Sequence, residues 1–572
     1  MTKITILDGY VDEPTCLGVP PYISTYPRYI AGAIYQTNPE LDIQYRTIDQ
    51  IRQNKNYLQK INQSELLIII AGMAVPGRYL SGYPLQPSEL KRILQTIHHP
   101  QLLLCGPAAR YGFGIAGGKK TEKLSSHSSP IDACITGDPE IVISNLIKNN
   151  GDINAVDLSK QRPNSASIGE FAEKGAALVT QHPYFPHYLL AEIETYRGCP
   201  RSITKGCSFC TEPLKGPPDF RPISHIIKEI NALYKQGIRH FRIGNQPCLF
   251  TYMAKDAAKK EIPKPNPDAL ETLFSQIRTV APKLKTLHID NVNPGVVARF
   301  PQESKQIIET IIQHHTPGDV AAFGVESLDP AVIQHNNLKA NEQQIIEAIT
   351  LFNKYGKKRG TNGLPELLPG INLVFGLKGE TKKTYTINYT FLQEIIKKNL
   401  LIRRINIRQV LPLPDTPMEA IGNSIIKKHK PLFKHFKYNV KHHIEQPLLK
   451  TLVPKDTILT KVISELWKGK TTFGRQLGSY PLLVGIPGQF PLYNSLDVIV
   501  IDHGYRSITA LPYPVPINTA QRETIQHLPF IGKKRTNRIL LQRPFHDKKE
   551  FSASLDDPHI TEKIIPYLSF QQ

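Results

Sequence analysis

The chain has 572 residues, 40% of them hydrophobic, and a formal net charge of +21. A chain of this length is too long to fold around one hydrophobic core, so we expect three or four domains. The N-terminus lacks a basic leader followed by a long apolar run, so we expect neither a signal peptide nor a membrane span. Seven cysteines in so long a chain argue against a secreted disulfide framework and predict a reducing, cytoplasmic location.

The first 150 residues predict an alternating α/β unit. Four short apolar runs predict strands, each ending in glycine or small residues: 4–7, 66–71, 102–104 and 133–135. Helical spacing appears between and beside them: 28–35, 88–98 and 140–148. Strands that end in small residues at one edge are typical of a parallel sheet with a binding edge. We therefore predict a Rossmann-like domain over residues 1–150.

A polar linker, residues 157–169, and an entry segment precede a longer alternation over residues 185–417. Its predicted strands are 192–196, 240–243, 286–289, 320–325, 371–375 and 405–410. Its predicted helices are 223–236, 267–280, 302–315, 341–355 and 382–398. Six strands joined by helical crossovers make a six-fold βα array, an open or partial barrel. Ligands of such arrays bind at the C-terminal ends of the strands.

Three cysteines, Cys199, Cys207 and Cys210, come directly after the first strand of this array. Thiolates bind soft metals, and three of them on one loop can hold three irons of a four-iron cluster and leave the fourth iron open to a small ligand. Two alternatives stay open: a zinc loop that lacks its fourth ligand, and three unconnected thiols. We favour the cluster, because structural zinc normally takes four protein ligands.

The alternation stops after residue 417, and the chain becomes basic. Residues 421–572 hold 22 Lys and Arg against 11 Asp and Glu, and two interpretations of this charge stay open, a polyanionic partner and a solvated basic surface. Residues 421–467 predict a helical connector and 473–516 a small antiparallel β unit, so we place these two in one region, 418–516. Residues 517–572 predict helix, hairpin and helix, with Asn518 or Thr519 as N-cap and residues 533–542 as the second helix.

A cysteine loop after the first strand of a six-fold βα array resembles the radical S-adenosylmethionine (SAM) superfamily. The resemblance covers about residues 185–417, although seven residues separate Cys199 from Cys207 where the superfamily usually has three. It implies that a [4Fe–4S] cluster on Cys199, Cys207 and Cys210 binds SAM and cleaves it reductively to a 5′-deoxyadenosyl radical. It also implies an electron donor such as ferredoxin or flavodoxin.

The same resemblance implies which residues surround SAM. Phe209 matches an aromatic position that packs on the adenine. The strand ends supply the other expected cofactor-binding residues, which are Gly244 and Asn245 in place of a Gly-Gly-Glu motif, Glu326 and Ser327 toward the ribose or methionine, Gly376 and Glu380 beside the adenosine, and Arg408 facing the cavity.

The N-terminal unit resembles the cobalamin-binding domain that precedes many radical SAM cores, through its stretch Leu17-Gly-Val-Pro-Pro-Tyr22. It lacks the Asp-x-His-x-x-Gly ligand motif of cobalamin proteins. It is also similar to the N-terminal domain of methylthiotransferases, whose second cluster would here use Cys16, Cys105 and Cys134. A substrate-capping role without a cofactor is the third alternative.

The C-terminal residues resemble the helix-hairpin-helix module of nucleic-acid proteins. The resemblance implies that Gly532, Lys533, Lys534 and Arg535 hold a phosphate of a nucleic acid, RNA in our interpretation. The whole order resembles a group of archaeal radical SAM proteins with such a module. We therefore predict a radical SAM enzyme that modifies tRNA or rRNA. Two alternatives stay open: a radical SAM enzyme acting on a small metabolite or peptide, and a nucleic-acid-binding protein with a structural or redox-sensing cluster.

Overall fold

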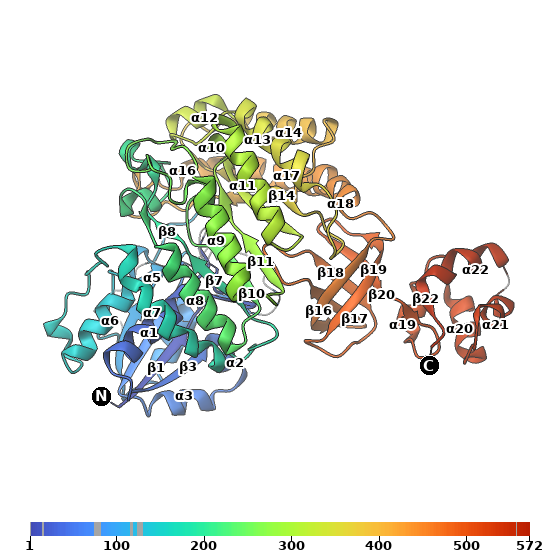
Figure 1. The fold of residues 1–572 in the computed structure, drawn as a ribbon, viewed down its shortest axis with the longest axis horizontal. Helices are drawn as coiled ribbons and strands as arrows, with labels where there is room; N and C mark the ends of the chain where they lie inside the picture. The colour runs from blue at the N-terminus through green and yellow to red at the C-terminus, as the bar shows by residue number, and fades with distance from the viewer. Residues whose placement is uncertain are drawn as a thin grey trace.

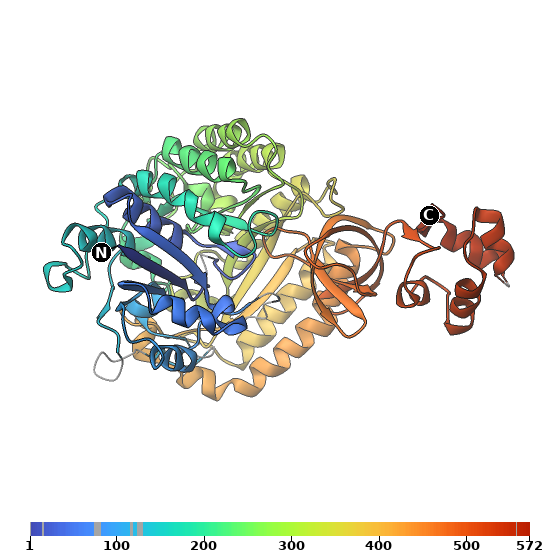
Figure 2. The same ribbon diagram turned by 90° about the horizontal axis from the view of Figure 1, so that it is seen from below.

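The structure is a computed structural model that describes residues 2–13, 17–73, 80, 82–114, 118–122, 130–555 and 557–571. An N-terminal α/β unit packs against a central array, and a small barrel leads from the array to a helical C-terminal module at the far end of the molecule (Figures 1 and 2). Within the described residues, no helix is both long and apolar enough to cross a membrane.

The N-terminal unit is a parallel five-stranded sheet of order β3-β1-β4-β5-β6. The strands are β1 (Lys3–Asp8), β3 (Asp42–Thr47), β4 (Leu66–Ile70), β5 (Gln101–Cys105) and β6 (Ala133–Cys134). The helices are α1 (Thr25–Thr37), α2 (Ile48–Gln53), α3 (Asn56–Ile61), α4 (Pro87–Leu94), α5 (Pro107–Tyr111) and α6 (Pro139–Lys148). The predicted parallel α/β unit is confirmed. Strand β3 was missed because it is an edge strand that alternates polar and apolar residues instead of forming an apolar run.

The segment between the two units forms η2 (Ile153–Ala155), η3 (Ser165–Ile168), α7 (Gly169–Lys174) and η4 (Gly175–Gln181). Within the predicted linker, residues 157–169, the helical part is η3 and the first residue of α7, and the other two elements lie outside it. Helix α7 crosses α1 at two glycines. A Cβ on Gly32 would lie 1.8 Å from the carbonyl oxygen of Phe171, and a Cβ on Gly175 would lie 1.8 Å from that of Arg28. This close approach joins the N-terminal unit to the array through one continuous hydrophobic core.

The central array contains all six predicted strands. They are β7 (Leu190–Glu194), β10 (His240–Gly244), β11 (Thr286–Ile289), β13 (Asp319–Glu326), β14 (Leu367–Phe375) and β15 (Arg404–Gln409), with β12 (Asn291–Val292) between β11 and β13. Two four-stranded sheets result, β11-β10-β7-β2 and β12-β13-β14-β15. Because β2 (Tyr22–Ile23) comes from the N-terminal unit and pairs with β7, that unit closes one edge of the array.

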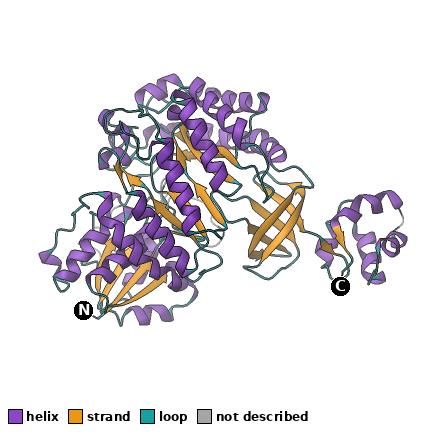
Figure 3. Ribbon diagram, in the orientation of Figure 1, coloured by secondary structure: helices purple, strands orange, loops and turns teal. Residues whose placement is uncertain are grey.

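Helices cover the outer face of the array, and its strands lie inside (Figure 3). They are α8 (Ile223–Gln236), α9 (Pro267–Val280), α10 (Pro294–Arg299), α11 (Pro301–His314), α12 (Pro330–His335), α13 (Glu342–Gly356) and α14 (Lys382–Lys397). The bounds of α8 and α9 match the prediction, because their apolar residues recur at helical spacing.

The connector is helical only as far as Leu452. It comprises α15 (Pro417–Ile421), α16 (Ser424–Lys428), α17 (Lys430–Asn439), the π-helix η8 (Val440–Glu445) and α18 (Gln446–Leu452). A closed barrel of order β16-β17-β18-β20-β19 follows. Its strands are β16 (Ile458–Lys468), β17 (Thr471–Arg475), β18 (Leu483–Pro487), β19 (Ser495–His503) and β20 (Ser507–Pro512). The β unit thus begins earlier than predicted, and it is not purely antiparallel because β18 and β20 run parallel.

The C-terminal module holds α19 (Arg522–Gln526), α20 (Lys533–Gln542), α21 (Lys548–Ser554) and α22 (Pro558–Ile564), with β21 (Val515–Pro516) paired to β22 (Leu568–Ser569). The second predicted helix agrees with α20. The predicted N-cap is wrong, because Gln521 precedes α19. The side chain of Asn518 instead exchanges hydrogen bonds with the backbone of Phe545, at 2.9 and 2.8 Å.

The crossing of α1 and α7 generates a prediction for stability. Gly32→Ala should lower the free energy of unfolding by about 2 kcal/mol, since overpacking a close contact typically costs 1–3 kcal/mol. Denaturant unfolding followed by circular dichroism measures the change. Gly532→Ala is the matched control, because a Cβ there would meet nothing within 4 Å. Equal stability of the two variants would contradict the proposed crossing.

Candidate active site

The three predicted ligand cysteines lie on one loop at the C-terminal end of β7. The loop runs between two paired strands, β8 (Tyr196–Arg197) and β9 (Asp219–Phe220), and contains the short helices η5 (Pro200–Thr204) and η6 (Glu212–Lys215). The Gly198 N–H donates to the Glu212 carboxylate at 2.9 Å. Cys207 is buried, and Cys199 and Cys210 are partly buried. The pairing of β8 with β9 therefore closes the loop that carries the three thiols.

The three thiols are the ones predicted to hold the cluster, and their role as its ligands stays a prediction. Among the side chains that the structure describes, no three of His, Cys, Asp or Glu converge as the ligands of one metal ion would. In a [4Fe–4S] cluster each thiolate binds a different iron, so the sulfurs need not meet at one point. Burial raises the pKa of the Cys199 thiol to about 12, and a bound metal offsets such a cost because it binds the thiolate directly.

The extra residues between Cys199 and Cys207 include an arginine that supports the loop. Arg201 is 5% exposed and donates from Nη1 to the Cys207 sulfur at 3.1 Å. Its other nitrogens contact Glu261 at 2.6 Å and Asn337 at 2.9 Å. Lys205, by contrast, is exposed. The longer spacing therefore places one guanidinium against a ligand sulfur and leaves the second cation on the surface.

A further cation, Lys339, reaches the same place and was not predicted. Its ammonium lies 4.0 Å from the Glu326 carboxylate, and Gly324 makes room, because a Cβ there would come within 2.3 Å of Nζ. Burial lowers the pKa of Lys339, but Cys207, Glu326 and the two other loop thiols raise it above its ordinary value. A single lysine between α12 and α13 gives no indication in the sequence that it lies near the cysteine loop. Only the fold brings its charge to the thiols.

Two of the predicted cofactor residues lie at the ends of neighbouring strands. Glu326 ends β13 with a φ of 63°, and burial raises its pKa. Gly376 follows β14 with a φ of 91°. Glu380 accepts hydrogen bonds from the Gly376 N–H, from the Tyr385 hydroxyl at 2.8 Å and from His429 at 2.9 Å. Glu380 thereby holds the glycine-rich turn in shape, and its contact with a cofactor stays a prediction.

Phe209 and Ser327 differ in what they offer to a ligand. Phe209 lies at the margin of an apolar cluster beside the thiols, which is made of Cys207, Val332, Leu338, Leu377, Val410, Met418 and Ile426. This position suits packing against a flat ring. Ser327 is 1% exposed, and its hydroxyl accepts from the Asp329 N–H at 3.2 Å. It therefore shapes the turn after β13.

The residues after β10 point away from one another. A Cβ on Gly244 would lie 1.9 Å from Oε1 of Glu192, so only glycine fits. Asn245 donates to Glu194 on β7 at 3.1 Å and to the Thr25 hydroxyl of the N-terminal unit at 3.4 Å. The next residue, Gln246, is fully buried and accepts from the Thr195 hydroxyl at 3.2 Å. The strand end is therefore occupied by local hydrogen bonds.

Arg408 lies near the end of β15, and its place facing the cofactor cavity stays a prediction. It is partly buried. Burial raises the pKa values of Glu326 and Asp12, and the charge of Arg408 partly offsets both shifts. Arg408 is therefore the cation that links the end of β15 to the end of β13.

Deeper in the array, charged side chains form a network that the sequence analysis missed. Arg242 makes ion pairs with Glu192 and Asp290, and all three side chains are fully buried. Tyr480, from the β17–β18 loop of the barrel, donates to Asp290 at 2.8 Å. The guanidinium of Arg404 lies 3.6 Å from the centre of the Tyr480 ring. The sequence could have indicated this network through charged residues at alternate positions of strands that were predicted to be buried.

A cavity of about 310 Å³ joins the edge of the N-terminal sheet to the back of the cysteine loop. Its lining is largely charged and includes Glu13, Arg110, Glu140, Arg162 and Lys215. This volume lies at the lower end for drug-sized ligands, and a corrin is larger than such ligands. The described lining therefore fits a small polar molecule. Cobalamin stays a prediction.

The residues predicted for a second cluster are only partly described. Cys105 on β5 is fully buried, and Cys134 lies on the adjacent strand β6, paired with Leu104. Cys16 lies outside the described residues. The second cluster therefore stays a prediction.

Residues 193–384 match the family model described as the Radical SAM superfamily. The chain belongs to the radical SAM superfamily. It is 46% identical to an uncharacterized protein of Methanocaldococcus jannaschii over 89% of this chain and 92% of that protein. It is 40% identical to an uncharacterized protein of Archaeoglobus fulgidus over 96% of this chain and 97% of that protein.

More distant similarities are shorter or structural. The chain is 23% identical to tRNA-2-methylthio-N(6)-dimethylallyladenosine synthase of Bdellovibrio bacteriovorus, over 34% of this chain and 38% of that enzyme. The solved structure of the radical S-adenosylmethionine methyltransferase TsrM from Kitasatospora setae aligns with a TM-score of 0.45 and 12% identity, over 73% of this chain and 75% of that one.

This radical SAM enzyme uses a [4Fe–4S] cluster and SAM, which together supply a reductively generated carbon radical. Its own residues prepare the place for them. Cys199, Cys207 and Cys210 present the thiols, and Arg201 and Lys339 put positive charge beside them. The apolar cluster with Phe209 at its margin lies beside the same thiols.

Removal of one ligand tests the cysteine loop. Cys207→Ala should reduce the iron and acid-labile sulfide of the reconstituted protein to near zero, because two thiolates do not retain a cluster that needs three. Elemental analysis and the visible absorbance spectrum measure the loss. Cys248→Ala, which removes a buried thiol off the loop, should keep its iron. A full cluster in Cys207→Ala would refute the assignment.

The charge of Lys339 should tune the cluster. Lys339→Gln should make the midpoint potential more negative, on the order of tens of millivolts, because a nearby cation stabilises the more negative reduced form. A redox titration followed by electron paramagnetic resonance measures it. Lys397→Gln, which alters a lysine that is 76% exposed on α14, should leave the potential unchanged. A potential unaltered in both variants would place Lys339 away from the cluster.

Proposed function

We propose that this radical SAM enzyme modifies a tRNA or an rRNA. The observation that carries the proposal is the closed five-stranded barrel of order β16-β17-β18-β20-β19, which directly follows the catalytic array. Five-stranded barrels of the OB type bind oligonucleotides. A barrel of this kind gives the enzyme a means of holding a nucleic acid.

The barrel is attached where a bound nucleic acid would lie close to the array. Thr286 donates from its hydroxyl to the carbonyl of Leu477 at 3.1 Å, and the Ser479 N–H donates to His288 at 2.8 Å. Thr286 and His288 are both on β11. The β17–β18 loop is therefore seated against the array, which supports delivery of a barrel-bound strand to the enzyme's concave face.

The charge of the C-terminal half supports the same class of substrate. Residues 421–572 hold 22 Lys and Arg against 11 Asp and Glu, and cationic surfaces of this kind release counterions from a polyanion. The distant relatives named as tRNA-2-methylthio-N(6)-dimethylallyladenosine synthases act, by their name, on tRNA. Their similarity adds support for RNA as the substrate class.

The C-terminal helix pair provides a second proposed contact. Gly532 stands at the N-terminus of α20 without a side-chain cap, so backbone N–H groups are available there. Lys533 and Lys534 are exposed beside it, and Arg535 donates to the Phe530 carbonyl at 3.1 Å. A helix N-terminus with flanking lysines favours a phosphate. We propose that these residues act as a helix-hairpin-helix contact to the RNA backbone.

Loss of the gene tests this function. A deletion strain should lack one modified nucleoside of tRNA or rRNA and accumulate its unmodified or less modified precursor, as measured by mass spectrometry of digested RNA. Complementation with the wild-type gene should restore the nucleoside, and complementation with Cys207→Ala should not. Identical nucleosides in the deletion and parent strains would refute an RNA substrate.

A small metabolite or peptide is the second candidate substrate. Arg404 and Arg408 are partly buried on the concave side, and in the described part of the chain neither forms an ion pair with a carboxylate. Between them Asn406 donates to Asn372 at 3.2 Å. Such a polar surface complements a small anion. Unchanged RNA nucleosides together with one accumulated metabolite in the deletion strain would favour this candidate.

A further inference from the structure

The helical segment before the barrel carries a one-sided positive charge. Residues 421–444 contain no Asp or Glu. Their six lysines are all exposed: Lys427, Lys428, Lys430, Lys434, Lys437 and Lys441. A surface of this length without a carboxylate is not neutralised from within its own segment. It is complementary to a polyanion.

Helix α17 and the π-helix that continues it have one buried and one open face. Phe433, Phe436, Val440 and Ile444 are buried against the array. On the other face, Tyr438 is 57% exposed. A large aromatic side chain that is exposed to water adds little to the stability of the fold. π-helical turns, in addition, occur frequently at functional sites. The open face therefore offers apolar rings among cations.

Three rings form a stack across this face. The ring centres of Tyr438 and His442 lie 4.0 Å apart, and those of His442 and Tyr505 lie 4.2 Å apart. Tyr505 comes from the β19–β20 loop of the barrel and is 40% exposed. Loops of this kind, between the fourth and fifth strands, belong to the binding surface of OB-type barrels. The stack thus joins the basic helix to the barrel at the loop between the fourth and fifth strands, which belongs to the binding surface of OB-type barrels.

The stack is held in place without any ligand. Arg506, next to Tyr505, makes an ion pair of 2.5 Å with Glu445, the last residue of the π-helix. His503 hydrogen-bonds the Val453 carbonyl at 2.6 Å. Two contacts therefore fix the loop on the helical segment, so a stacking partner does not have to order it on binding.

The rings are arranged to receive a base and its phosphate. The ammonium of Lys441 lies 4.6 Å from the centre of the Tyr505 ring. Desolvation and the neighbouring charges of Lys441 and His443 lower the pKa of His442. Stacked rings with flanking ammonium groups are the arrangement that proteins use for single-stranded nucleic acids.

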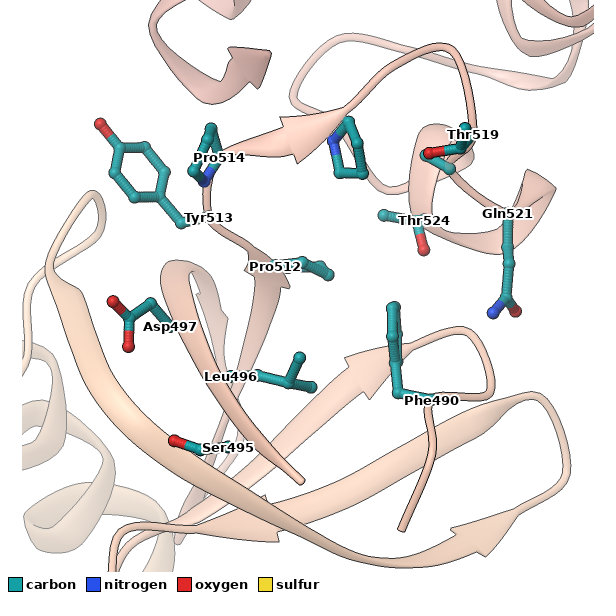
Figure 4. Close-up of a pocket in the computed structure, with 12 residues that line it drawn as sticks. Phe490, Ser495, Leu496, Asp497, Pro512, Tyr513, Pro514, Thr519, Gln521 and Thr524 are labelled. Atoms are coloured by element: carbon teal, nitrogen blue, oxygen red, sulfur yellow. The ribbon is translucent and has the colours of Figure 1, made fainter. Parts of the chain in front are cut away.

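A separate cavity near the barrel lacks the lysine side chains that surround the ring stack. A cavity of about 610 Å³ lies between β19, β20 and the start of the C-terminal module, and its lining includes Phe490, Leu496, Pro512 and Thr524 (Figure 4). Asp497 is the charged residue of that lining. A cavity with a carboxylate and without a cation does not complement a phosphate backbone. The basic helix is the better match for RNA.

We propose that the surface of Tyr438, His442 and Tyr505, with Lys434, Lys437 and Lys441, binds a single-stranded segment of the substrate RNA. Unstacked bases lie on the outer faces of the tyrosine rings, and the lysines contact the phosphates. The inference rests on the proposed function for its choice of RNA. A duplex would not fit, because its bases are already stacked on one another.

Binding of a short RNA tests the surface. The probe is a fluorescein-labelled single-stranded RNA of about 12 nucleotides and mixed sequence, titrated with the full-length protein by fluorescence anisotropy. The double variant Tyr438→Ala, Tyr505→Ala should bind at least about tenfold more weakly, because one stacked base is worth roughly 1–3 kcal/mol. Tyr438→Phe, Tyr505→Phe keeps both rings and should bind as the wild type does.

The lysines are tested by salt dependence. For Lys434→Gln, Lys441→Gln the slope of log K against log [KCl] should become shallower by about 0.7 for each lost phosphate contact. Lys259→Gln, Lys260→Gln on the exposed surface of the array is the matched charge control, and Tyr83→Ala, which removes a 49% exposed ring, is the aromatic control. Both controls should retain wild-type affinity and slope. Iron content and melting temperature confirm that each variant is folded.

Several outcomes would overturn the inference. They are equal affinity of the alanine double variant and the wild type, equal affinity for the same RNA as a duplex, and equal binding to vesicles of anionic phospholipid. If the variant loses affinity while the deletion strain has unchanged RNA nucleosides, the surface stands and the proposed function fails. If a nucleoside is missing in the deletion strain while the variant binds normally, the proposed function stands and the surface is wrong.

Discussion

The buried ion pairs of Arg242 with Glu192 and Asp290 are the interaction on which the arrangement of the three large units depends. A guanidinium without access to water must be neutralised, and removing one partner of such a pair typically costs 3–5 kcal/mol. The network ties β7 and β10 to the junction of the two sheets. Tyr480 of the barrel donates to the same Asp290 at 2.8 Å. Tyr22, beside β7, donates to the Gly478 carbonyl of the same barrel loop at 2.7 Å. The N-terminal unit, the array and the barrel therefore meet at one set of polar contacts.

This meeting point gives the barrel a defined position relative to the cysteine loop. The loop lies at the C-terminal end of β7, and the barrel contacts β11 of the same array. A strand bound to the barrel, as we propose, would lie close to β15, which carries Arg404 and Arg408. Stacking of Tyr505 on His442 adds a second attachment between barrel and array. Two attachments restrain rotation more than one, so the fold sets the distance from the proposed RNA-binding surface to the cysteine loop.

The cysteine loop is also held by contacts between distant parts of the chain. Arg201 and Lys339 come from different parts of the chain, and both place positive charge beside the loop thiols. Gly324 and Gly198 matter here because side chains at these positions would enter the space of Lys339 and of the Pro217 carbonyl. The charges stabilise thiolates that burial alone would disfavour. The long spacing from Cys199 to Cys207 thus serves the support of the loop, through Arg201.

The sequence by itself determined the alternation of strands and helices, the bounds of α8, α9 and α20, and the position of the cysteine loop after the first strand of the array. These features depend on local periodicity and spacing, which neighbouring residues carry. Only the tertiary structure decided that β2 pairs with β7, that the barrel begins at Ile458, and that Lys339 and Tyr505 reach the sites described for them. Each of these depends on contacts between residues far apart in the chain. Their energies come from packing and burial, which no local pattern records.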